Sequence, residues 1–567
     1  MVFQSTIKRK KMTIYKILVG FAFFCFLQTH AQTNRHVATT GSDVTGTGTL
    51  ANPFKTIQKA ADIVQPGDTV FVHQGTYRNA DFNDGDIWGG DNLVKITANG
   101  NADNYITFMP FPGDHVLLES DSNYNILLKN ASYIQIIGFE AKGNGDMITQ
   151  AEADAAWGLY KDSNGTVHDL AIELGIDIND PALRGTTLAK PPTPNIKKPS
   201  YYNGRGIVAS QSHHIIIKNN IVHDMTGSAI RADKSDYVTI TNNEVYHNTY
   251  WTSAGVGAIT VAEATVTPSN DTFTGVKIKL LKNNVHHNEN RLISWAPSKT
   301  IIKMVIDEGT GLFLTRNQDT YTQGKILIAN NISSFNGASG IVCHKTDRAI
   351  IEHNTCYKNG TTNDSAAGGI GVNNADNVII RNNISYAEPD HWALGKLGGT
   401  LTNITISNNI LYNENGTQAI HKNMPNGWTE ENPLLTNPEN GDFTLSQNSP
   451  AIDAGNSTST IIDDIVGNLR NDGLPDIGAY EFISVLNVEE VQNRDIKMYP
   501  NPTTGKIFLS GAFENLNKIK IYDQTGRIVL TKIITKNTNL ISLNLSHVSS
   551  GLYYLKTDCC VQPVIKK

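Results

Sequence analysis

The sequence predicts an all-β protein: a right-handed parallel β-helix with an N-terminal capping helix, followed by a small C-terminal β-sandwich. The main observation is a phrase with paired asparagines that recurs along the middle of the chain. It reads KNNIVHD at 218–224, TNNEVYHN at 241–248, KNNVHHN at 282–288, ANNISSFN at 329–336, EHNTCYKN at 352–359, RNNISYA at 381–387 and SNNILYN at 407–413. A phrase that recurs with occasional insertions is typical of stacked coils, with one coil per repeat.

The residues around the phrase indicate how each coil is built. Short β-branched runs such as VTIT and VIIR precede it, which favours strands over helices. The second asparagine, or its equivalent, falls at positions 220, 243, 284, 331, 354, 383 and 409. A side-chain amide repeated at one place in every coil can hydrogen-bond its copies above and below, which satisfies buried polar atoms. We therefore expect an asparagine ladder along the stack.

The first 31 residues have the pattern of a secretory signal peptide. Five basic residues precede or begin the apolar run ILVGFAFFCFL at 17–27, and the segment ends at the small residue Ala31. These 11 apolar residues are too few to span a bilayer, since a membrane helix needs about 20. We expect a secreted protein without a transmembrane anchor.

Residues 492–567 form a separate predicted domain, which a linker at 485–491 joins to the rest. Alternating apolar strands separated by glycine-containing turns predict a small β-sandwich. The segments YPNPTTGKIFL, YDQTGRIV and SGLYYLK resemble the C-terminal sorting domain of the type IX secretion system of Bacteroidetes. The resemblance implies that this machinery exports the protein to the outer-membrane surface, or releases it, in a Gram-negative Bacteroidetes-type bacterium. A carbohydrate-binding module is the structural alternative.

The charge is unevenly distributed along the chain. The net charge is −6, but residues 1–31 hold five bases and no acid and residues 492–567 carry +7, so 32–491 carry −18. A charge of that size argues against nucleic acid as a partner and is compatible with calcium. Any anionic substrate must meet a local basic stripe. Five cysteines make no disulfide framework. We expect a monomer, stabilised by its long apolar stack.

The predicted β-helix, 32–484, has a distinctive segment at each end. In the N-terminal segment, 35–75, apolar residues recur at helical spacing at Phe54, Ile57, Ala60, Ala61 and Val64. A helix there would cover the open end of the stack. This block resembles the start of many bacterial β-helix enzymes, including family 9 pectate lyases. Residues 449–482, ending in PDIGAYEF, resemble a segment that closes secreted β-helix proteins. Their aspartates indicate Asx turns, with calcium binding as the alternative.

Two insertions interrupt the repeat, at 145–205 and 288–325. Long insertions in a solenoid emerge as loops on one face, which is often the binding face. Tryptophans in and near these segments are candidates for stacking on sugar rings, although each could instead be a packing residue. The predicted substrate-binding tryptophans are Trp251, Trp295 and Trp392.

Strand alternation arranges the polar residues in columns. In the short strand before each phrase, we align as inward-facing Ile207, Ile230, Ile259, Leu312, Ile341 and Ile370. One outward column then contains Val208, Arg231, Thr260, Phe313, Val342 and Gly371. The next contains Ser210, Asp233, Ala262, Thr315, His344 and Asn373. The adjoining turn contains Gln211, Lys234, Glu263, Arg316, Lys345 and Asn374.

These columns predict a stripe of ionisable groups on one face, spaced by about 4.8 Å from coil to coil. The candidate catalytic residues are Lys345, His344, Arg316, Arg231, Glu263 and Asp307. Lys234 is a candidate substrate-binding residue, and Asp233 and Glu308 are candidate Ca²⁺ ligands. Clustered opposite charges beside aromatic rings are typical of a functional site. The alternative is the solvated face of a solenoid.

Two reactions could use these groups. β-Elimination on a polyuronate needs a cation beside the substrate carboxylate and a base such as His344, Lys345 or Arg316. Glycoside hydrolysis needs two carboxyls, which Glu263 could supply together with Asp307 or Glu308. A non-catalytic adhesin that binds glycans is a third interpretation.

The family resemblance narrows this choice only in part. Family 9 pectate lyases hold calcium with an aspartate cluster and use a lysine base in the coils. Asp233 and Asp236, in ADKSD, match that cluster in part, but Ala209 and Ser210 stand in the preceding coil where another acid is expected. The resemblance therefore implies a carbohydrate-active β-helix. We predict a secreted polysaccharide-degrading enzyme, a lyase acting on an acidic glycan, with a β-helix glycoside hydrolase and the adhesin as alternatives.

Overall fold

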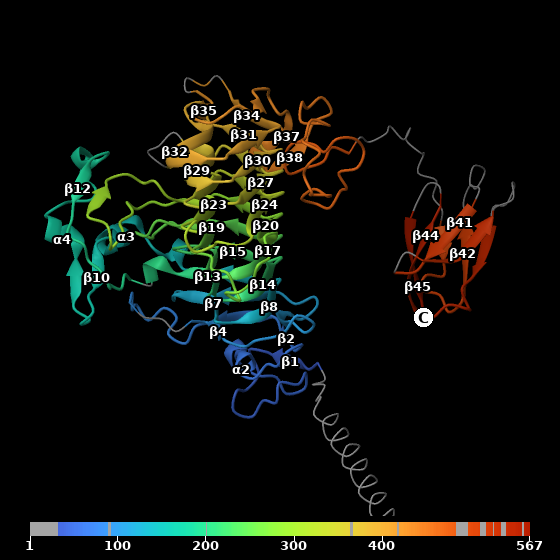
Figure 1. Cartoon of the computed structure of the whole chain (residues 1–567). Helices are drawn as coiled ribbons and strands as arrows, with labels where there is room; N and C mark the ends of the chain where they lie inside the picture. Colours follow the sequence, from blue (N-terminus) through green and yellow to red (C-terminus); the bar gives the residue numbers. More distant parts are fainter. Residues whose placement is uncertain are drawn as a thin grey trace, which may run out of the picture. The chain divides into compact units, whose positions relative to one another are not determined.

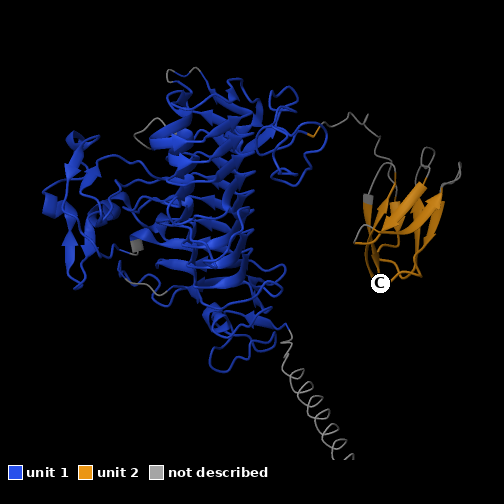
Figure 2. Ribbon diagram, in the orientation of Figure 1, with its two compact units in different colours: residues 1–482 blue, residues 483–567 orange. Residues whose placement is uncertain are grey.

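The computed structural model describes residues 32–88, 92–199, 201–362, 367–414, 416, 419–483, 497–510, 518–524, 527–533, 540–557 and 561–567. The predicted signal peptide and the predicted linker lie outside these residues. Figure 2 shows two compact units, residues 1–482 and 483–567.

The first unit is a stack of coils, and a typical coil contributes one strand to each of three parallel sheets (Figure 1). Sheet I contains β4 (Val94–Ile96), β7 (Tyr124–Lys129), β13 (Arg205–Ser210), β16 (Ile230–Asp233), β19 (Gly257–Ala262), β23 (Thr310–Thr315), β26 (Ile341–His344), β29 (Ala367–Asp376), β32 (Trp392–Thr402) and β35 (His421–Lys422). Sheet II contains β1 (Asn34–Val37), β2 (Thr69–Val72), β5 (Ile106–Pro110), β8 (Ser132–Ile137), β14 (His213–Lys218), β17 (Asp236–Thr241), β20 (Val276–Leu281), β24 (Lys325–Ala329), β27 (Ala349–Glu352), β30 (Ile379–Arg381) and β33 (Thr405–Ser407). Sheet III contains β3 (Gly75–Arg78), β6 (Val116–Glu119), β9 (Glu140–Lys142), β15 (Ile221–His223), β18 (Glu244–Tyr246), β21 (Asn284–His286), β25 (Ile332–Ser334), β28 (Thr355–Tyr357), β31 (Ile384–Ala387), β34 (Asn409–Asn413) and β36 (Trp428–Thr429).

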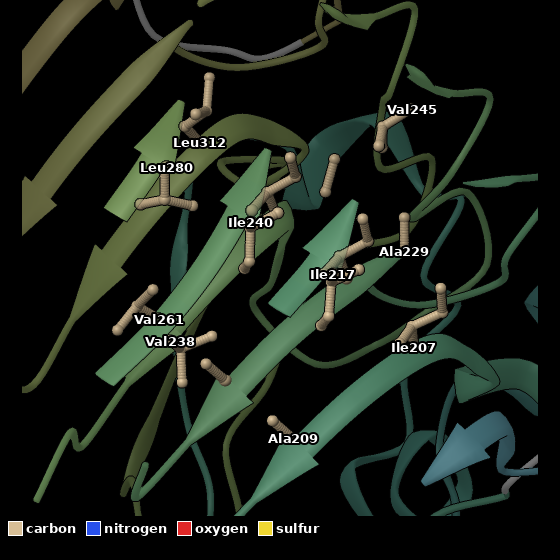
Figure 3. Packing of buried hydrophobic residues seen from close by; sticks show 14 of the residues in the cluster. Ile207, Ala209, Ile217, Ala229, Val238, Ile240, Val245, Val261, Leu280 and Leu312 are labelled. Carbon is tan, nitrogen blue, oxygen red and sulfur yellow. The ribbon is translucent and has the colours of Figure 1, made fainter. Parts of the chain in front are cut away.

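The predicted register of sheet I is confirmed. Ile207 pairs with Ile230, Ile230 with Ile259, and the series continues through Leu312 and Ile341 to Ile370. These side chains are buried and belong to one continuous core between the sheets (Figure 3). Because successive side chains of a strand point to opposite faces, burying this column fixes the polar columns on the outer face of sheet I.

The asparagine ladder is present, with one correction. It runs through Asn220, Asn243, Asn283, Asn331, Asn354, Asn383 and Asn409. The backbone N–H and the side-chain Nδ2 of each asparagine donate hydrogen bonds to the Oδ1 of the next, at 2.9–3.1 Å. The prediction of Asn284 at the third position is wrong, because Asn284 begins β21 and pairs with Glu244. A second ladder, which the sequence analysis missed, joins Asn248, Asn288, Asn336 and Asn359 at 2.8–3.1 Å.

The two neighbouring asparagines give a matched test of the ladder. We expect Asn283→Ala to lower the free energy of unfolding by about 2–4 kcal/mol, because it leaves buried hydrogen-bond donors and acceptors on both adjoining coils without partners. The fully buried Asn283 also donates to the carbonyl of Ile240 at 3.0 Å. Asn284→Ala should change the stability by less than about 0.5 kcal/mol. Denaturant unfolding of the two variants measures both values, and an equal loss in both would contradict the assigned register.

The contacts of the two end segments of the first unit show where each segment packs on the stack. The capping helix is α2 (Ile57–Ala61), whose side chains Ile57, Ala60 and Ala61 are buried against the first coils. Residues 449–482 run along the side of the stack, since Asp463 pairs with Lys282 at 2.7 Å and the Ala479 N–H donates to Thr355 Oγ1. This segment therefore supports several coils at the turn between sheets II and III instead of covering the end. A short antiparallel hairpin precedes this segment, with β37 (Leu435–Asn437) and β38 (Asp442–Leu445) joined through η4 (Pro438–Asn440).

The second unit consists of two antiparallel sheets. One contains β39 (Lys497–Tyr499), β40 (Lys506–Ser510) and β43 (Leu540–Asn544), and the other contains β41 (Lys518–Tyr522), β42 (Ile528–Ile533), β44 (Gly551–Lys556) and β45 (Val561–Lys566). Alternate side chains of these strands, such as Ile507, Ile519 and Leu555, form its own hydrophobic core. The predicted β-sandwich is thus present.

The two insertions fold together into a side lobe, defined here as residues 145–203 and 288–309. Its elements are η1 (Gly145–Met147), α3 (Gln150–Ala156), β10 (Leu159–Lys161), β11 (Val167–Asp169), α4 (Leu170–Leu174), η2 (Pro181–Leu183), β12 (Thr187–Ala189), η3 (Tyr201–Asn203) and β22 (Ile301–Lys303). β12 pairs antiparallel with β22, which joins the two insertions. The lobe has a small core of its own that includes Trp157 and Trp295. It lies beside the strands of sheet I (Figure 1).

Candidate functional site

A groove separates the side lobe from the outer face of sheet I. It consists of two adjoining hollows of about 550 and 560 Å³ that share Lys299, Lys303, Asp307 and Glu308. One hollow lies over β13 and β16 and contains Arg205 and Arg231. The other lies over β23, β26 and β32, and it is lined by Phe313, Val342, His344, Asn373 and Trp392. The groove therefore follows the axis of the stack.

The groove is basic, although the surrounding segment is strongly acidic. Its basic side chains are Lys198, Arg205, Arg231, Lys299, Lys303 and Arg316, and its acidic ones are Asp307 and Glu308. A cleft lined by one sign of charge raises the local concentration of ligands of the opposite sign. The lining thus supplies the basic stripe that an anionic ligand requires.

His344 lies at the floor of this groove with an imidazole that is neutral at physiological pH. Burial, together with Lys345, Arg316 and Lys299, lowers the pKa of His344 to about 4. Its Nδ1 lies 2.9 Å from the hydroxyl of Thr315 in the neighbouring coil. When this nitrogen carries the proton and donates it to Thr315, the lone pair of Nε2 is available to accept a proton.

Glu308 belongs to the side lobe, lines the same hollow as His344, and has a pKa that is shifted in the reverse direction. Burial and the neighbouring Asp307 raise the pKa of Glu308 well above its ordinary value, and Arg316 only partly opposes this. Glu308 packs against the backbone of Gly255, where a Cβ would come within 2.5 Å of its Oε1. Within the described residues the Glu308 carboxyl has no hydrogen-bond or ion-pair partner. A carboxyl with a raised pKa that lines the same hollow as a neutral histidine can act as a proton donor there.

Arg316 and Lys234 meet at the predicted turn column. Glu263 bridges them, 3.0 Å from Arg316 Nε and 3.5 Å from Lys234 Nζ. The three residues and Lys345 all have a positive φ between 45° and 55°, so the column is a series of identical left-handed turns. Arg316 lines the groove, whereas Glu263, Lys234 and Lys345 lie at its rim and are absent from the lining. Glu263 and Lys345 therefore stay predictions as catalytic residues, at positions outside the lining of the groove.

The two predicted calcium ligands lie in different environments. Arg231 Nε donates to both carboxylate oxygens of Asp233, at 2.7 and 2.8 Å, so this carboxylate already has a cationic partner. Glu308 is a poor cation ligand while it is protonated. Within the described part of the chain, no group of three or more His, Cys, Asp and Glu side chains has the arrangement of a metal site. These two residues therefore do not fit a joint Ca²⁺ site.

The three predicted tryptophans differ in their accessibility. Trp251 is buried in the lobe core and its Nε1 donates to the Gly145 carbonyl at 2.7 Å, so it is a packing residue. Trp295 is only 3% exposed, and Lys198 Nζ lies 3.6 Å from its ring centroid. Burial in the lobe core argues against Trp251 as a sugar platform, whereas Trp295 also lines the groove and stays a prediction. Trp392 lines the groove, with Lys422 over one side of its ring at 4.0 Å.

Sequence reasoning missed four basic residues of the groove, Lys198, Arg205, Lys299 and Lys303. Lys198 Nζ donates to the carbonyls of Ser253 and Trp295 and to the Ser253 hydroxyl, at 3.0, 2.6 and 3.2 Å. Burial lowers the pKa of Lys198. The three acceptors, however, match the three hydrogens of an ammonium group, and an ammonium has no lone pair with which to act as a base. The proline-rich and lysine-rich stretch before Arg205 was a sequence signal for Lys198 and Arg205 alone.

A larger hollow of about 680 Å³ lies at the N-terminal end of the stack, beside α2. Its lining includes Lys55, Arg78 and Lys95 but no histidine or acid among the described residues. It offers no acid–base pair, and we place the candidate site in the groove.

Comparison with family models agrees with this architecture. Residues 35–174 match the family described as "Pel9A-like, right handed beta helix region", and residues 118–293 match "Right handed beta helix region". Residues 497–567 match "Secretion system C-terminal sorting domain". The chain is a right-handed parallel β-helix with a type IX secretion sorting domain. Secretion by this route delivers a protein to the cell surface or the extracellular space, and within the described residues no helix combines the length and apolar character of a membrane span.

Several solved structures resemble this β-helix protein at low identity. A pectate lyase, Pel9A, is 12% identical, with 80% of this chain and 97% of that chain covered and a TM-score of 0.40. An alginate lyase from Paenibacillus sp. is 14% identical over 66% of this chain and 95% of that chain, with a TM-score of 0.34. A GH136 lacto-N-biosidase from Eubacterium ramulus is 13% identical over 70% and 67%, with a TM-score of 0.36. Comparison with curated proteins gives no match.

Proposed function

We propose that the protein is a secreted polysaccharide lyase that cleaves a uronate-containing glycan by β-elimination in the groove. The observation that carries this proposal is a neutral His344 at the floor of a groove whose other ionisable groups are mostly cations. β-Elimination needs this combination, because the base must be unprotonated while cations offset the carboxylate next to the C5 proton. Hydrolysis of a neutral glycan has no such need for cations.

The roles of the side chains follow from their positions. Arg316 and Lys299 lie close enough to His344 to lower its pKa, so a uronate carboxylate bound to them would also lie near the imidazole. That carboxylate would offset part of their charge and raise the pKa of His344 within the complex, which strengthens the base once substrate is bound. Trp392 and Phe313 provide apolar surface in the same hollow.

In the proposed reaction, His344 accepts one proton from the substrate and Glu308 donates one to it. His344 Nε2 takes the C5 proton, the C4–O bond breaks as the C4=C5 double bond forms, and the Glu308 carboxyl gives its proton to the departing oxygen. One proton is taken and one is given, so solvent exchange alone restores both residues. The opposite pKa shifts of the two residues suit them to these roles.

A product assay tests the proposal. The secreted protein, incubated with pectate, alginate and glycosaminoglycans, should yield an unsaturated product that absorbs in the ultraviolet from at least one of them. New reducing ends without that absorbance would reject the lyase in favour of a hydrolase. Glycan binding without either product would favour the non-catalytic adhesin.

A glycoside hydrolase is the second candidate, because one observation favours it. Asp307 and Glu308 are adjacent in the groove, and Asp307 contributes to the raised pKa of Glu308. A protonated and an ionised carboxyl are the pair that glycosidases use. Asp307 accepts a hydrogen bond from Ser294 Oγ at 3.2 Å.

Calcium stays a prediction, and chelation tests it. Since Asp233 is held by Arg231 and Glu308 favours the protonated form, we expect activity to survive exhaustive chelation. We would measure the rate after dialysis against a chelator, with Mg²⁺ supplied as a control for ionic strength. A loss that Ca²⁺ alone restores would assign a catalytic cation and reject this expectation.

A further inference from the structure

We infer that Arg205 forms a carboxylate-binding subsite at the end of the groove remote from His344. This inference rests on the proposed function and extends it to a second anchoring point on the glycan. It predicts that long acidic chains bind far better than short ones, and that Arg205 is the cause of this preference.

Among the described residues, no carboxylate forms an ion pair with Arg205. Its Nη1 donates to the phenolic oxygen of Tyr124 at 3.3 Å, and its guanidinium lies 5.7 Å from the centroid of that ring. Its Nε is buried without a hydrogen-bond partner. Within the described residues Arg205 makes no ion pair. Both carboxylate oxygens of the nearby Asp233 accept hydrogen bonds from Arg231 Nε instead.

Such a guanidinium favours an anionic ligand over a neutral one. A partly buried cation loses hydration that the protein does not replace here, and a ligand carboxylate would restore it. The planar guanidinium fork matches the two oxygens of a carboxylate. Because Arg205 lines the groove, a bound glycan can reach it. A hydroxyl of a neutral sugar would leave the charge uncompensated.

The separation between Arg205 and His344 sets the length of the ligand. In sheet I, β13 and β26 are four positions apart in the order β13, β16, β19, β23, β26. At about 4.8 Å per strand, the two residues are separated by roughly 19 Å along the stack. A single sugar is far too short to contact both, so an acidic oligosaccharide must extend along the groove between them.

Binding measurements on a catalytically silent chain test the subsite. In a His344→Ala background, we would titrate dimers and octamers of the uronates that the native chain cleaves, or of galacturonate and mannuronate if it cleaves none. Arg205→Gln should weaken octamer binding by about 10- to 100-fold and leave dimer binding at the His344 end unchanged. Arg205→Lys, which keeps the charge but loses the fork, should weaken it less. Octamers with reduced carboxyls should bind both forms equally weakly.

The outcomes separate this inference from the proposed function. Equal octamer binding by Arg205→Gln and its parent would overturn the subsite, even if the native chain proves to be a lyase. Equal weakening for dimers and octamers would also overturn it, because it would show a general effect on the groove. If the native chain produces no unsaturated ends but octamer binding still depends on Arg205, the subsite stands without the lyase. Should Arg205→Gln fail to fold, Arg205→Lys carries the same comparison.

Discussion

Under the proposed lyase mechanism, replacing His344 by alanine should reduce kcat for β-elimination by about 100- to 10,000-fold, the range that a general base contributes. His344 packs near Phe313, with 6.2 Å between ring centroids, and its only described side-chain hydrogen bond joins Thr315. The loss of these contacts is small, so the variant should fold normally and still bind substrate. Initial rates of unsaturated-product formation measure the effect. A variant with more than a tenth of native activity would exclude His344 as the base.

The same residue sets the acid limit of activity. The base works when unprotonated and the acid when protonated, so kcat/KM should fall as the pH drops through about 4, and fall again as the pH rises through the raised pKa of Glu308. Arg316 is one of the cations that lower this pKa, so Arg316→Gln should move the acid limit to higher pH. Lys218→Gln, which removes an exposed charge from sheet II, is the matched control and should not move it. A limit near the ordinary histidine value of about 6.5 in the native chain would contradict the assignment.

Glu308→Gln should be the second most damaging change, with kcat lower by about 100-fold or more, because the leaving oxygen loses its proton donor. In a lyase, Asp307→Asn should cost much less, whereas a hydrolase needs both carboxyls. Parallel rates for these two isosteric variants therefore discriminate between the two reactions. Equal and severe losses would favour the hydrolase.

Stability against pH gives an independent reading of Glu308. Its folded pKa is raised, so its favourable contribution is complete below the unfolded value of about 4.3 and is lost as pH rises through the folded value. Glutamine cannot ionise, so Glu308→Gln should match the native chain in acid and exceed its Tm at mildly alkaline pH. A lower Tm of the variant at alkaline pH would show that the carboxylate is stabilised in the fold.

The sequence was sufficient for the coil register because each coil buries an unambiguous apolar residue. Counting from those residues, rather than from the asparagines, would also have corrected the one shifted position. The ladder asparagine precedes the central buried residue of sheet III by two, as Asn220 precedes Val222 and Asn283 precedes Val285. The phrase KNNVHHN has one residue fewer before its valine, so its second asparagine moves out of the ladder.

The other wall of the groove could not be predicted in the same way. The side lobe has no repeat, and its side chains are arranged by contacts between segments that are distant in sequence. Trp157 Nε1 donates to the carbonyl of Ile293 at 2.6 Å, and Trp295 Nε1 donates to that of Trp157 at 3.0 Å. No periodic pattern distinguishes such a packing tryptophan from a sugar platform. Lys198 was missed for the same reason, since only the folded lobe brings it to the groove, whereas Arg205 begins β13 of sheet I, one residue before the segment that was aligned.

The pairing of β12 with β22 has a consequence for the order in which the chain folds. Ala189 meets Ile301 across this pairing, and several complete coils are made from the chain between them. A nascent or translocating polypeptide can therefore wind its early coils before the facing wall exists. The groove is complete only when the second insertion emerges and docks, so a chain truncated ahead of it would form the early coils without the facing wall of the groove.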